Sequence, residues 1–393
     1  MRNIRIFLFF TYLFISFSAH SQEEIRNWYD DSKKLPKEIY HVAKNSNGKI
    51  KQGLYQIYYQ NGKLWQTGDY KNGELNGLWK VYFEEGSLKQ QLTYKMGKRE
   101  GLCETFYSNG QLYQSINYLE DKYEGEMKTY YETGKIMESV SYKNGLMDGP
   151  VSGYKEDGQL LYKRNYVKGR ANGEWELHYE NGNISEKSIK KNDLYDGLFI
   201  GYYKDKENGT KETECYYSNG KLNGTFIGFH PNGTIMLKCN YVNNSIEGSF
   251  EEYYENGQLK EKGDYLNNKK VGVWVAYYPS GKINVEGKYK DNLFEGEWKV
   301  YFENGTIKQV GNYEKGLAEG EWKYYYDNGK INEEGMYRKD QKDGSWKKYY
   351  DTGELKVDYH FCSGKLNGTQ KAYEKDGKVL EQKEYNDGVE EEK

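Results

Sequence analysis

A glycine that returns at a constant interval constrains this chain more than any other feature. All steps of the first glycine series are equal, except that the step from Gly182 to Gly209 is longer. A second glycine series runs in parallel with the same period, from Gly53 to Gly368. The first series comprises Gly62, Gly86, Gly110, Gly134, Gly158, Gly182, Gly209, Gly233, Gly257, Gly281, Gly305, Gly329, Gly353 and Gly377. A fixed period of about 24 residues predicts an array of about 14 repeats over roughly positions 49–389.

The stretch GEWKVYFENGTIKQVGNY, which starts at Gly296, shows what one repeat is. Two short β-favouring segments are joined by Asn304-Gly305, a strong signal for a two-residue type I′ hairpin. The repeat is therefore predicted to be a β-hairpin. The two-residue loop predicts that Glu303 faces Thr306, Phe302 faces Ile307, Val300 faces Gln309 and Trp298 faces Gly311.

The same register predicts a packed face on which large residues oppose small ones. In most other repeats, too, a large residue is predicted to face a small one, or two medium-sized residues to face each other. The predicted pairs are Trp274 with Gly287, Trp322 with Gly335, Phe250 with Gly263, Cys103 with Ile116 and Met127 with Val140, while Trp79 with Leu92 and Trp346 with Tyr359 depart from this pattern. The predicted core tryptophans are Trp79, Trp175, Trp274, Trp298, Trp322 and Trp346.

Composition agrees with a chain of tight hairpins. Gly reaches 45 residues against 4 Pro, and 43 Tyr offset a mean hydropathy of -1.05. Turns made by glycine rather than by proline favour an all-β protein. The two signs of charge are interleaved, so the sequence predicts no surface for nucleic acid.

Residues 1–21 are of another kind. Arg2 and Arg5 precede an apolar run, and small residues follow at Ala19 and Ser21, as in a secretory signal peptide cleaved after Ser21. The sequence predicts export to the periplasm, the outer membrane or the outside of the cell, with no transmembrane segment in the mature chain. An uncleaved N-terminal anchor is the alternative. We expect residues 22–48 to form a cap or linker and residues 390–393 a charged tail.

Stretches such as YYENGQLKEKGDYLNNKKVGVW, Tyr253 to Trp274, resemble the MORN repeat in its bacterial variant. The likeness covers nearly the whole mature chain, and such chains resemble the YwqK family of toxin-antitoxin antitoxins. The resemblance implies hairpins that pair edge to edge into one long twisted sheet. At about 4.8 Å per strand, we expect an elongated rod of roughly 130 Å. The antitoxin label implies binding to another protein, and the family supplies no catalytic residue.

Neither the cysteines nor the histidines form a catalytic or metal-binding pattern. Cys215 and Cys239 occupy the same position of successive repeats, about 10 Å apart, which exceeds the span of a disulfide. They are predicted to be free and to lie opposite Phe199 and Phe226. His178 and His230 are interpreted as substituted aromatic residues. The sequence therefore predicts no enzyme activity, no metal and no cofactor.

A ladder of aromatic residues recurs at one position after the second glycine, on the face opposite the tryptophans. Its members include Tyr253, Tyr277, Tyr301, Tyr325 and Tyr349. Such rings could anchor a protein or stack on the sugars of an envelope polysaccharide. Alternatively, they only pack against neighbouring Lys stems. The leading hypothesis is an exported, non-catalytic scaffold that binds another protein, and the alternative is a glycan-binding envelope module.

Overall fold

The computed structural model describes residues 22–46, 48–204 and 209–391. All 33 regular elements in these residues are β-strands. The predicted signal peptide, residues 1–21, lies outside the described residues, as do positions 205–208 of the lengthened turn and the last two positions of the tail. Across the described ranges there is no helix long and apolar enough to span a membrane.

The chain divides into two compact units, which are described separately. The first holds the described residues of 22–160 and 166–169, and the second holds the described residues of 161–165 and 170–391. Strands of the first unit are β1 (Glu23–Trp28), β2 (Pro36–Asn45), β3 (Gly48–Tyr58), β4 (Leu64–Lys71), β5 (Glu74–Tyr82), β6 (Leu88–Lys95), β7 (Lys98–Phe106), β8 (Leu112–Leu119), β9 (Lys122–Tyr130), β10 (Ile136–Lys143) and β11 (Leu146–Tyr154). Residues of β12 (Leu160–Val167) are divided between the units.

Strands of the second unit are β13 (Arg170–Ala171), β14 (Gly173–His178), β15 (Ile184–Lys191), β16 (Leu194–Tyr202), β17 (Lys211–Ser218), β18 (Lys221–Phe229), β19 (Ile235–Val242), β20 (Ser245–Tyr253), β21 (Leu259–Leu266), β22 (Lys269–Tyr277), β23 (Ile283–Lys290), β24 (Leu293–Tyr301), β25 (Ile307–Glu314), β26 (Leu317–Tyr325), β27 (Ile331–Arg338), β28 (Gln341–Tyr349), β29 (Leu355–Cys362), β30 (Lys365–Leu366), β31 (Gly368–Tyr373), β32 (Val379–Asn386) and β33 (Val389–Glu390).

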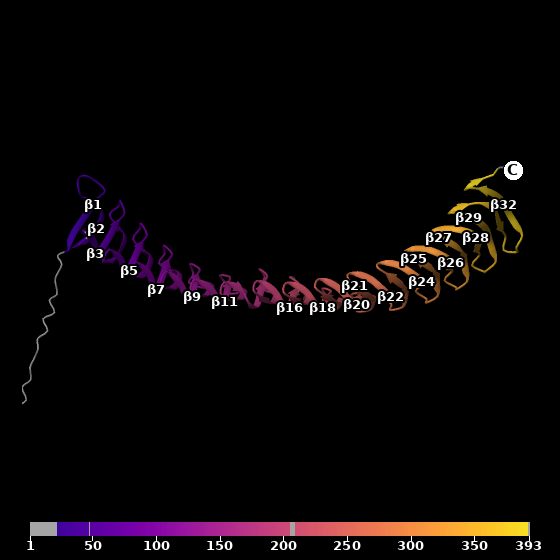
Figure 1. The fold of residues 1–393 in the computed structure, drawn as a ribbon, viewed down its shortest axis with the longest axis horizontal. Coiled ribbons are helices and arrows are strands. Elements are labelled where there is room, and N and C mark those ends of the chain that lie inside the picture. Colours follow the sequence, from indigo (N-terminus) through magenta and orange to yellow (C-terminus); the bar gives the residue numbers. More distant parts are fainter. Residues whose placement is uncertain (1–21, 47, 205–208, 392–393) are drawn as a thin grey trace, which may run out of the picture. The chain divides into compact units, whose positions relative to one another are not determined.

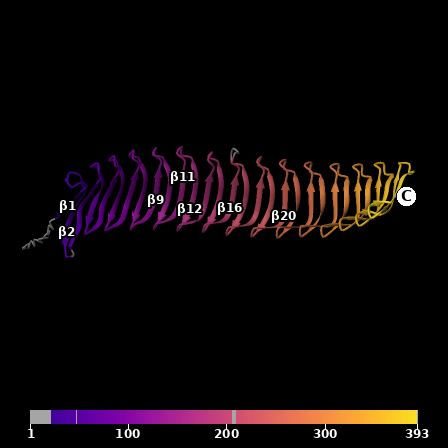
Figure 2. The same ribbon diagram turned by 90° about the horizontal axis from the view of Figure 1, so that it is seen from above.

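Neighbouring strands pair antiparallel in chain order. Within each unit the strands lie side by side, joined by alternating turns at their two ends (Figure 1, Figure 2). The strands belong to one antiparallel sheet. The predicted all-β array of consecutive hairpins is therefore confirmed.

The hairpin tip at Asn304-Gly305 differs from its prediction. Its loop has three residues, because the Phe302 N–H donates to the Thr306 carbonyl and the Gly305 N–H to the Phe302 carbonyl, both at 2.8 Å. Gly305 has a positive φ and Asn304 does not, whereas a type I′ turn needs both. Phe302 therefore meets Thr306 rather than Ile307, and the predicted pair of Glu303 with Thr306 is wrong.

A β-bulge on the returning strand restores the predicted register further from the tip. Tyr301 pairs with Ile307 and Val300 pairs with Gln309, so Lys308 has no residue opposite it. The extra loop residue and the bulged residue cancel. As a result, Trp298 pairs with Gly311 as predicted, and so do the equivalent pairs in other hairpins.

Turns of the type I′ form lie at the opposite end of the strands. Lys315 and Gly316 connect Glu314 to Leu317, and their φ angles are 50° and 83°. Positive φ at both central residues is what this turn requires. The Gly316 N–H also donates to the Phe294 carbonyl of the preceding hairpin at 2.9 Å. The connection between repeats is thus the tight turn, and it bonds to the neighbouring repeat.

Each of five tryptophans lies over a glycine of the preceding strand. A Cβ added at Gly311 would lie 2.0 Å from Cδ2 of Trp322, and Gly311 has an ordinary extended backbone. The Trp322 indole N–H donates to the Asn312 carbonyl at 3.2 Å, and its side chain is 2% exposed. The same arrangement joins Trp79 to Gly68, Trp274 to Gly263, Trp298 to Gly287 and Trp346 to Gly335.

This arrangement corrects the predicted packing while keeping the predicted register. Each ring rests on a glycine of the strand that precedes its own in the chain, rather than on the glycine of its own hairpin. This packing explains how Trp79 can pair with a large residue, Leu92, in the register. The Trp79 ring rests on Gly68 of the preceding strand and needs no small residue opposite it in its own hairpin. Neighbouring tyrosines meet these rings edge to face, as Tyr313 does with Trp322 at 5.0 Å between ring centres.

Side chains near the hairpin tips connect each repeat to the next. The Tyr278 hydroxyl donates to the Tyr301 carbonyl at 2.7 Å, and the Asn304 side-chain amide donates to the Asp327 carbonyl at 2.8 Å. Equivalent tyrosine bonds run from Tyr59 to Tyr82, Tyr107 to Tyr130, Tyr131 to Tyr154, Tyr179 to Tyr202, Tyr203 to Phe229, Tyr254 to Tyr277, Tyr326 to Tyr349 and Tyr350 to Tyr373. Tyrosine hydroxyls therefore link successive hairpins along each unit.

The two ends of the array depart from the repeat. In residues 22–48, β1 pairs with β2, and β2 pairs with β3 along the first edge. At the other end, Gln370 and Lys383 form the pair that is tryptophan with glycine in several interior hairpins. The last hairpin therefore replaces the apolar core with polar side chains, as a terminal repeat requires.

Candidate functional site

The face opposite the core tryptophans carries the predicted aromatic ladder, and we call it the ladder face. All five predicted members, Tyr253, Tyr277, Tyr301, Tyr325 and Tyr349, are half-buried. The ladder hydroxyls of Tyr253, Tyr301 and Tyr349 donate to Glu251, Glu286 and Glu334 at 2.6 to 2.7 Å. These three phenols already have partners within the sheet, which limits what they can offer to a ligand.

Burial raises the pKa of the Tyr301 phenol to about 12, and the hydrogen bond to Glu286 adds to the increase. Burial and a glutamate likewise raise the pKa of Tyr253 and of Tyr349 to about 12. Near neutral pH these phenols are therefore protonated donors held by glutamates. Tyr325 lines a hollow of about 380 Å³ together with Phe302 and Lys308. The ladder thus forms a half-buried layer on this face.

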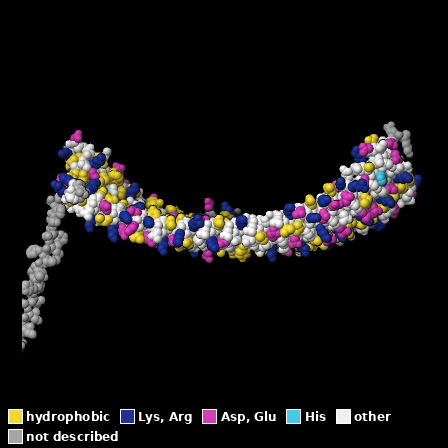
Figure 3. Space-filling model, viewed as in Figure 1, with side chains coloured by type: hydrophobic (Ala, Val, Ile, Leu, Met, Phe, Trp, Pro, Cys, Tyr) yellow, Lys and Arg dark blue, Asp and Glu magenta, His cyan; other side chains and the backbone are white. Residues whose placement is uncertain are grey.

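Lysines beside the ladder are paired with glutamates. Lys299 lies 2.5 Å from Glu297, and Lys323 lies 3.0 Å from Glu321. Figure 3 shows Lys and Arg interspersed with Asp and Glu on the visible face of both units. Exposed pairs of this kind add little stability and leave no strong field of one sign.

The histidines of the array take part in local bonding. His230 Nε2 lies 2.9 Å from the Tyr253 carbonyl, the place that a tyrosine hydroxyl occupies in other hairpins. His178 lies between the Glu176 carboxylate and the Gly182 carbonyl, at 2.9 and 3.0 Å. Both imidazoles therefore replace aromatic residues of the repeat, as the sequence indicates.

The four cysteines are free. Cys215 pairs with Phe199 and Cys239 pairs with Phe226, as predicted. Burial raises the pKa of both thiols to about 11, so they are protonated and unreactive near neutral pH. Among the described residues, no cluster of His, Cys, Asp or Glu is suited to a metal ion.

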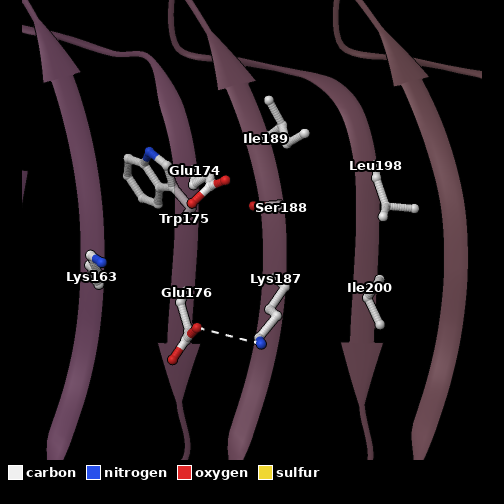
Figure 4. A pocket seen from close by; sticks show the side chains of 9 residues that line it. All are labelled: Lys163, Glu174, Trp175, Glu176, Lys187, Ser188, Ile189, Leu198 and Ile200. Carbon is white, nitrogen blue, oxygen red and sulfur yellow. Dashed lines mark ion pairs between the residues drawn. The ribbon is translucent and has the colours of Figure 1, made fainter.

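A hollow of about 330 Å³ lies over β12 to β16 in the second unit (Figure 4). Charged side chains line one part of it, with Lys187 3.7 Å from Glu176. Ile189, Leu198 and Ile200 line the other part. A volume of this size is at the lower end for ligand pockets, and it suits one or two inserted side chains.

Trp175, which also lines this hollow, departs from the other predicted core tryptophans. The equivalent position on the preceding strand holds Arg164 instead of glycine, and Trp175 is only half-buried. The Arg164 guanidinium lies 5.0 Å from the centre of the Trp175 ring and 4.2 Å from that of Tyr162. The Lys190 ammonium covers the Trp175 ring at 4.0 Å. Cations therefore pack against this ring where a bare strand glycine supports the others.

Apolar residues interrupt the ladder face beside the hollow. In the register, Leu198 pairs with Tyr216, while Lys187 and Glu214 both pair with Ile200 from opposite sides. Ile189 is 39% exposed and Tyr216 is 44% exposed. We call Ile189, Leu198, Ile200 and Tyr216 the apolar patch. Leu198 and Ile200 between them are half-buried. Neighbouring apolar residues at a surface mark interaction sites.

Sequence reasoning missed the apolar patch, although a position-by-position comparison of the repeats contains the signal. Positions equivalent to Ile189 hold Asp69, Thr93 and Asn117 in the first hairpins, and positions equivalent to Ile200 hold mostly charged or amide residues. An apolar residue at a position that is usually polar is therefore a departure from the repeat. The five ladder residues named above lie on this same face, but in other hairpins.

Comparison with known proteins agrees with the repeat. A family model described as MORN repeat variant matches most of the chain. The matched segments are residues 51–72, 75–96, 99–120, 123–144, 147–168, 171–189, 222–243, 246–267, 270–291, 294–315, 318–339, 342–363 and 366–387. Among curated proteins, none matches the sequence.

Solved structures show only a distant likeness. The crystal structure of TcdB2-TccC3 without its hypervariable C-terminal region is 10% identical, with a TM-score of 0.17, and covers 90% of this chain. The crystal structure of TcdB2-TccC3 is 12% identical, with a TM-score of 0.15, and also covers 90%. This chain spans 20% and 28% of those two chains. At these scores the likeness supports no functional argument.

Proposed function

Because the chain belongs to the MORN repeat variant family, we propose that it is an exported, non-catalytic scaffold that binds another protein through exposed side chains of its hairpins. The observation that supports the proposal is that each repeat uses one set of positions to join its neighbours and leaves another set exposed. Glycine, tryptophan, tyrosine and asparagine at fixed positions join one hairpin to the next. Exposed positions between them are free to vary, which is how repeat arrays build binding surfaces.

Export rests on residues 1–21. A basic start, an apolar run and small residues before Gln22 match a cleaved signal peptide. Mass spectrometry of the protein recovered from its native cell would test this directly. A mature chain that begins at Gln22 supports export, and a chain that retains its N-terminal segment in the cytosol contradicts it.

The partner is tested by cross-linking the chain from Gln22 onward in a native envelope fraction and identifying what is recovered. A parallel sample carries Tyr277, Tyr301 and Tyr325 changed to Ser. A defined protein that binds the purified native chain with measurable affinity supports the scaffold. Turnover of a substrate that depends on one cluster of side chains would overturn it.

The glycan-binding alternative uses the same variant. Polysaccharide recovered by the native chain and lost with the three serines would place that alternative first. The half-buried rings and the phenols bonded to glutamates argue against it, since a sugar-stacking ring must present an open face.

A further inference from the structure

The apolar patch and the charges beside it are arranged symmetrically about one strand. Ile200 and Leu198 lie on β16, at the centre. Lys187 on β15 and Glu214 on β17 flank Ile200 directly in the register. Tyr216 on β17 pairs with Leu198, while Ile189 lies at the bulge of β15, where a Cβ at Gly197 of β16 would be 3.2 Å from it. Opposite charges therefore stand at equivalent places on either side of β16, and each has an apolar residue two positions further along its strand.

This order is complementary to itself. A two-fold axis that runs along β16, in the plane of contact, places β15 of one copy over β17 of the other. Lys187 then faces Glu214 of the second copy, and Ile189 faces Tyr216 of the second copy. Ile200 and Leu198 meet their own equivalents on the axis. An isologous interface requires this kind of self-complementarity.

The hollow and the exposed tyrosine fit the same arrangement. The hollow extends from β16 toward β12, on one side of the axis. Tyr216, which is 44% exposed, stands on the other side. The two-fold rotation brings the Tyr216 ring of each copy toward the hollow of the other. Tyrosine is a frequent anchor at interfaces because it combines a large rigid ring with a polar tip.

We propose that the ladder face over β14 to β17 is a self-association surface, on which a second copy of this chain docks by inserting Tyr216 into the hollow. This inference stands apart from the proposed binding of another protein, which needs no second copy. The central strands span only about 15 Å, so the contact is small and of the transient class. We expect a monomer–dimer equilibrium in roughly the tens to hundreds of micromolar range.

Sedimentation velocity of the chain from Gln22 onward, over a concentration series, measures the association. The variants K187E and E214K each place like charges opposite one another twice in the dimer, and we expect each alone to weaken association by about tenfold or more. The K187E chain carries Glu at positions 187 and 214, and the E214K chain carries Lys at both. In an equimolar mixture, a heterodimer of the two therefore has an attractive Glu–Lys pair at both contacts. The mixture should therefore form a heterodimer close to the affinity of the unchanged chain.

The mixture also distinguishes a loss of contacts between two copies from a loss of ion pairs within one chain. Lys187 has a partner in Glu176 and Glu214 has one in Lys211, so each variant disturbs an internal pair that mixing cannot repair. Y216S should abolish association, whereas Y113S should not, since Tyr113 is a similarly exposed tyrosine of the first unit. Far-UV circular dichroism confirms that each variant is folded. A chain that stays monomeric throughout, or a dimer indifferent to Y216S and to mixing, would overturn the proposal.

Discussion

Replacing Gly311 with Ala tests the packing that holds the core together. The new Cβ would lie 2.0, 2.2 and 2.5 Å from three ring atoms of Trp322. Carbon atoms in contact prefer about 3.5 to 4.0 Å, so the ring must retreat by roughly 1.5 Å. That retreat disrupts the bond from the indole N–H to the Asn312 carbonyl and the edge contact with Tyr313. Overpacking alone costs about 1–3 kcal/mol, and partial exposure of the ring brings our expectation to about 3 kcal/mol.

The assay is hydrogen exchange by mass spectrometry on peptides from β25 and β26, because a repeat array opens locally and a single global unfolding free energy is not defined for it. The same substitution in a Trp322→Val background tests whether the cost comes from the clash with the Trp322 ring. In a Trp322→Val background the clash is absent, so Gly311→Ala should be neutral or slightly stabilising, by about 0.5 kcal/mol.

The matched control is Gly296→Ala, on the other strand of the hairpin that holds Gly311. Nothing beyond the chain neighbours lies within 4 Å of a Cβ at Gly296, but its φ is +70°. We expect a cost of about 1–2 kcal/mol from backbone strain alone, unchanged in the Trp322→Val background. Equal effects of Gly311→Ala with and without the Trp322 ring would refute the account of that glycine.

Three further predictions concern the links between hairpins, the thiols and the phenols. Tyr278→Phe removes the bond to the Tyr301 carbonyl and should weaken protection of the adjoining tips by about 1 kcal/mol in hydrogen exchange; unchanged protection would contradict a linking role. In the native protein at pH 8, a thiol reagent should label exposed Cys362 rapidly and the three buried cysteines only on unfolding, and four equal rates would contradict their burial. Because the folded pKa of Tyr301 is raised to about 12 from an unfolded value near 10, its contribution to stability is complete below pH 10 and is lost as the pH rises toward 12. A titration at 295 nm, followed together with circular dichroism, should show phenol ionisation and loss of strands occurring together above pH 10, and free ionisation of these phenols without unfolding would contradict it.

The register shows how a correct prediction can rest on a wrong detail. Asn304-Gly305 indicates a two-residue turn, yet the loop holds three residues. Asn304 serves through its side chain, which accepts a bond from the Thr306 N–H at 2.9 Å and donates to the next hairpin. Sequence preference alone does not distinguish an asparagine chosen for positive φ from one chosen for these bonds. The bulge at Lys308 then brings Trp298 back to Gly311.

The candidate site was harder to predict than the fold. The ladder stands out in the sequence because it repeats, but its phenols bond to glutamates across the face, which only the paired strands reveal. The four residues of the apolar patch do not recur together in another repeat, so periodicity hides the patch. Its residues lie between positions 189 and 216 and become neighbours only when β15, β16 and β17 pair.

The glycine period by itself determined that the chain forms consecutive hairpins, which residues share a face, and that tryptophan opposes glycine. Each strand pairs with the next strand in the chain, and side chains alternate between the two faces. Few alternative registers therefore remain once the hairpin length is known. Tertiary structure alone decided which glycine supports a tryptophan ring that has one on each side, as Trp322 has Gly311 on one neighbouring strand and Gly335 on the other. The ring leans toward the preceding strand, where its N–H finds the Asn312 carbonyl, and this choice depends on side-chain direction in three dimensions.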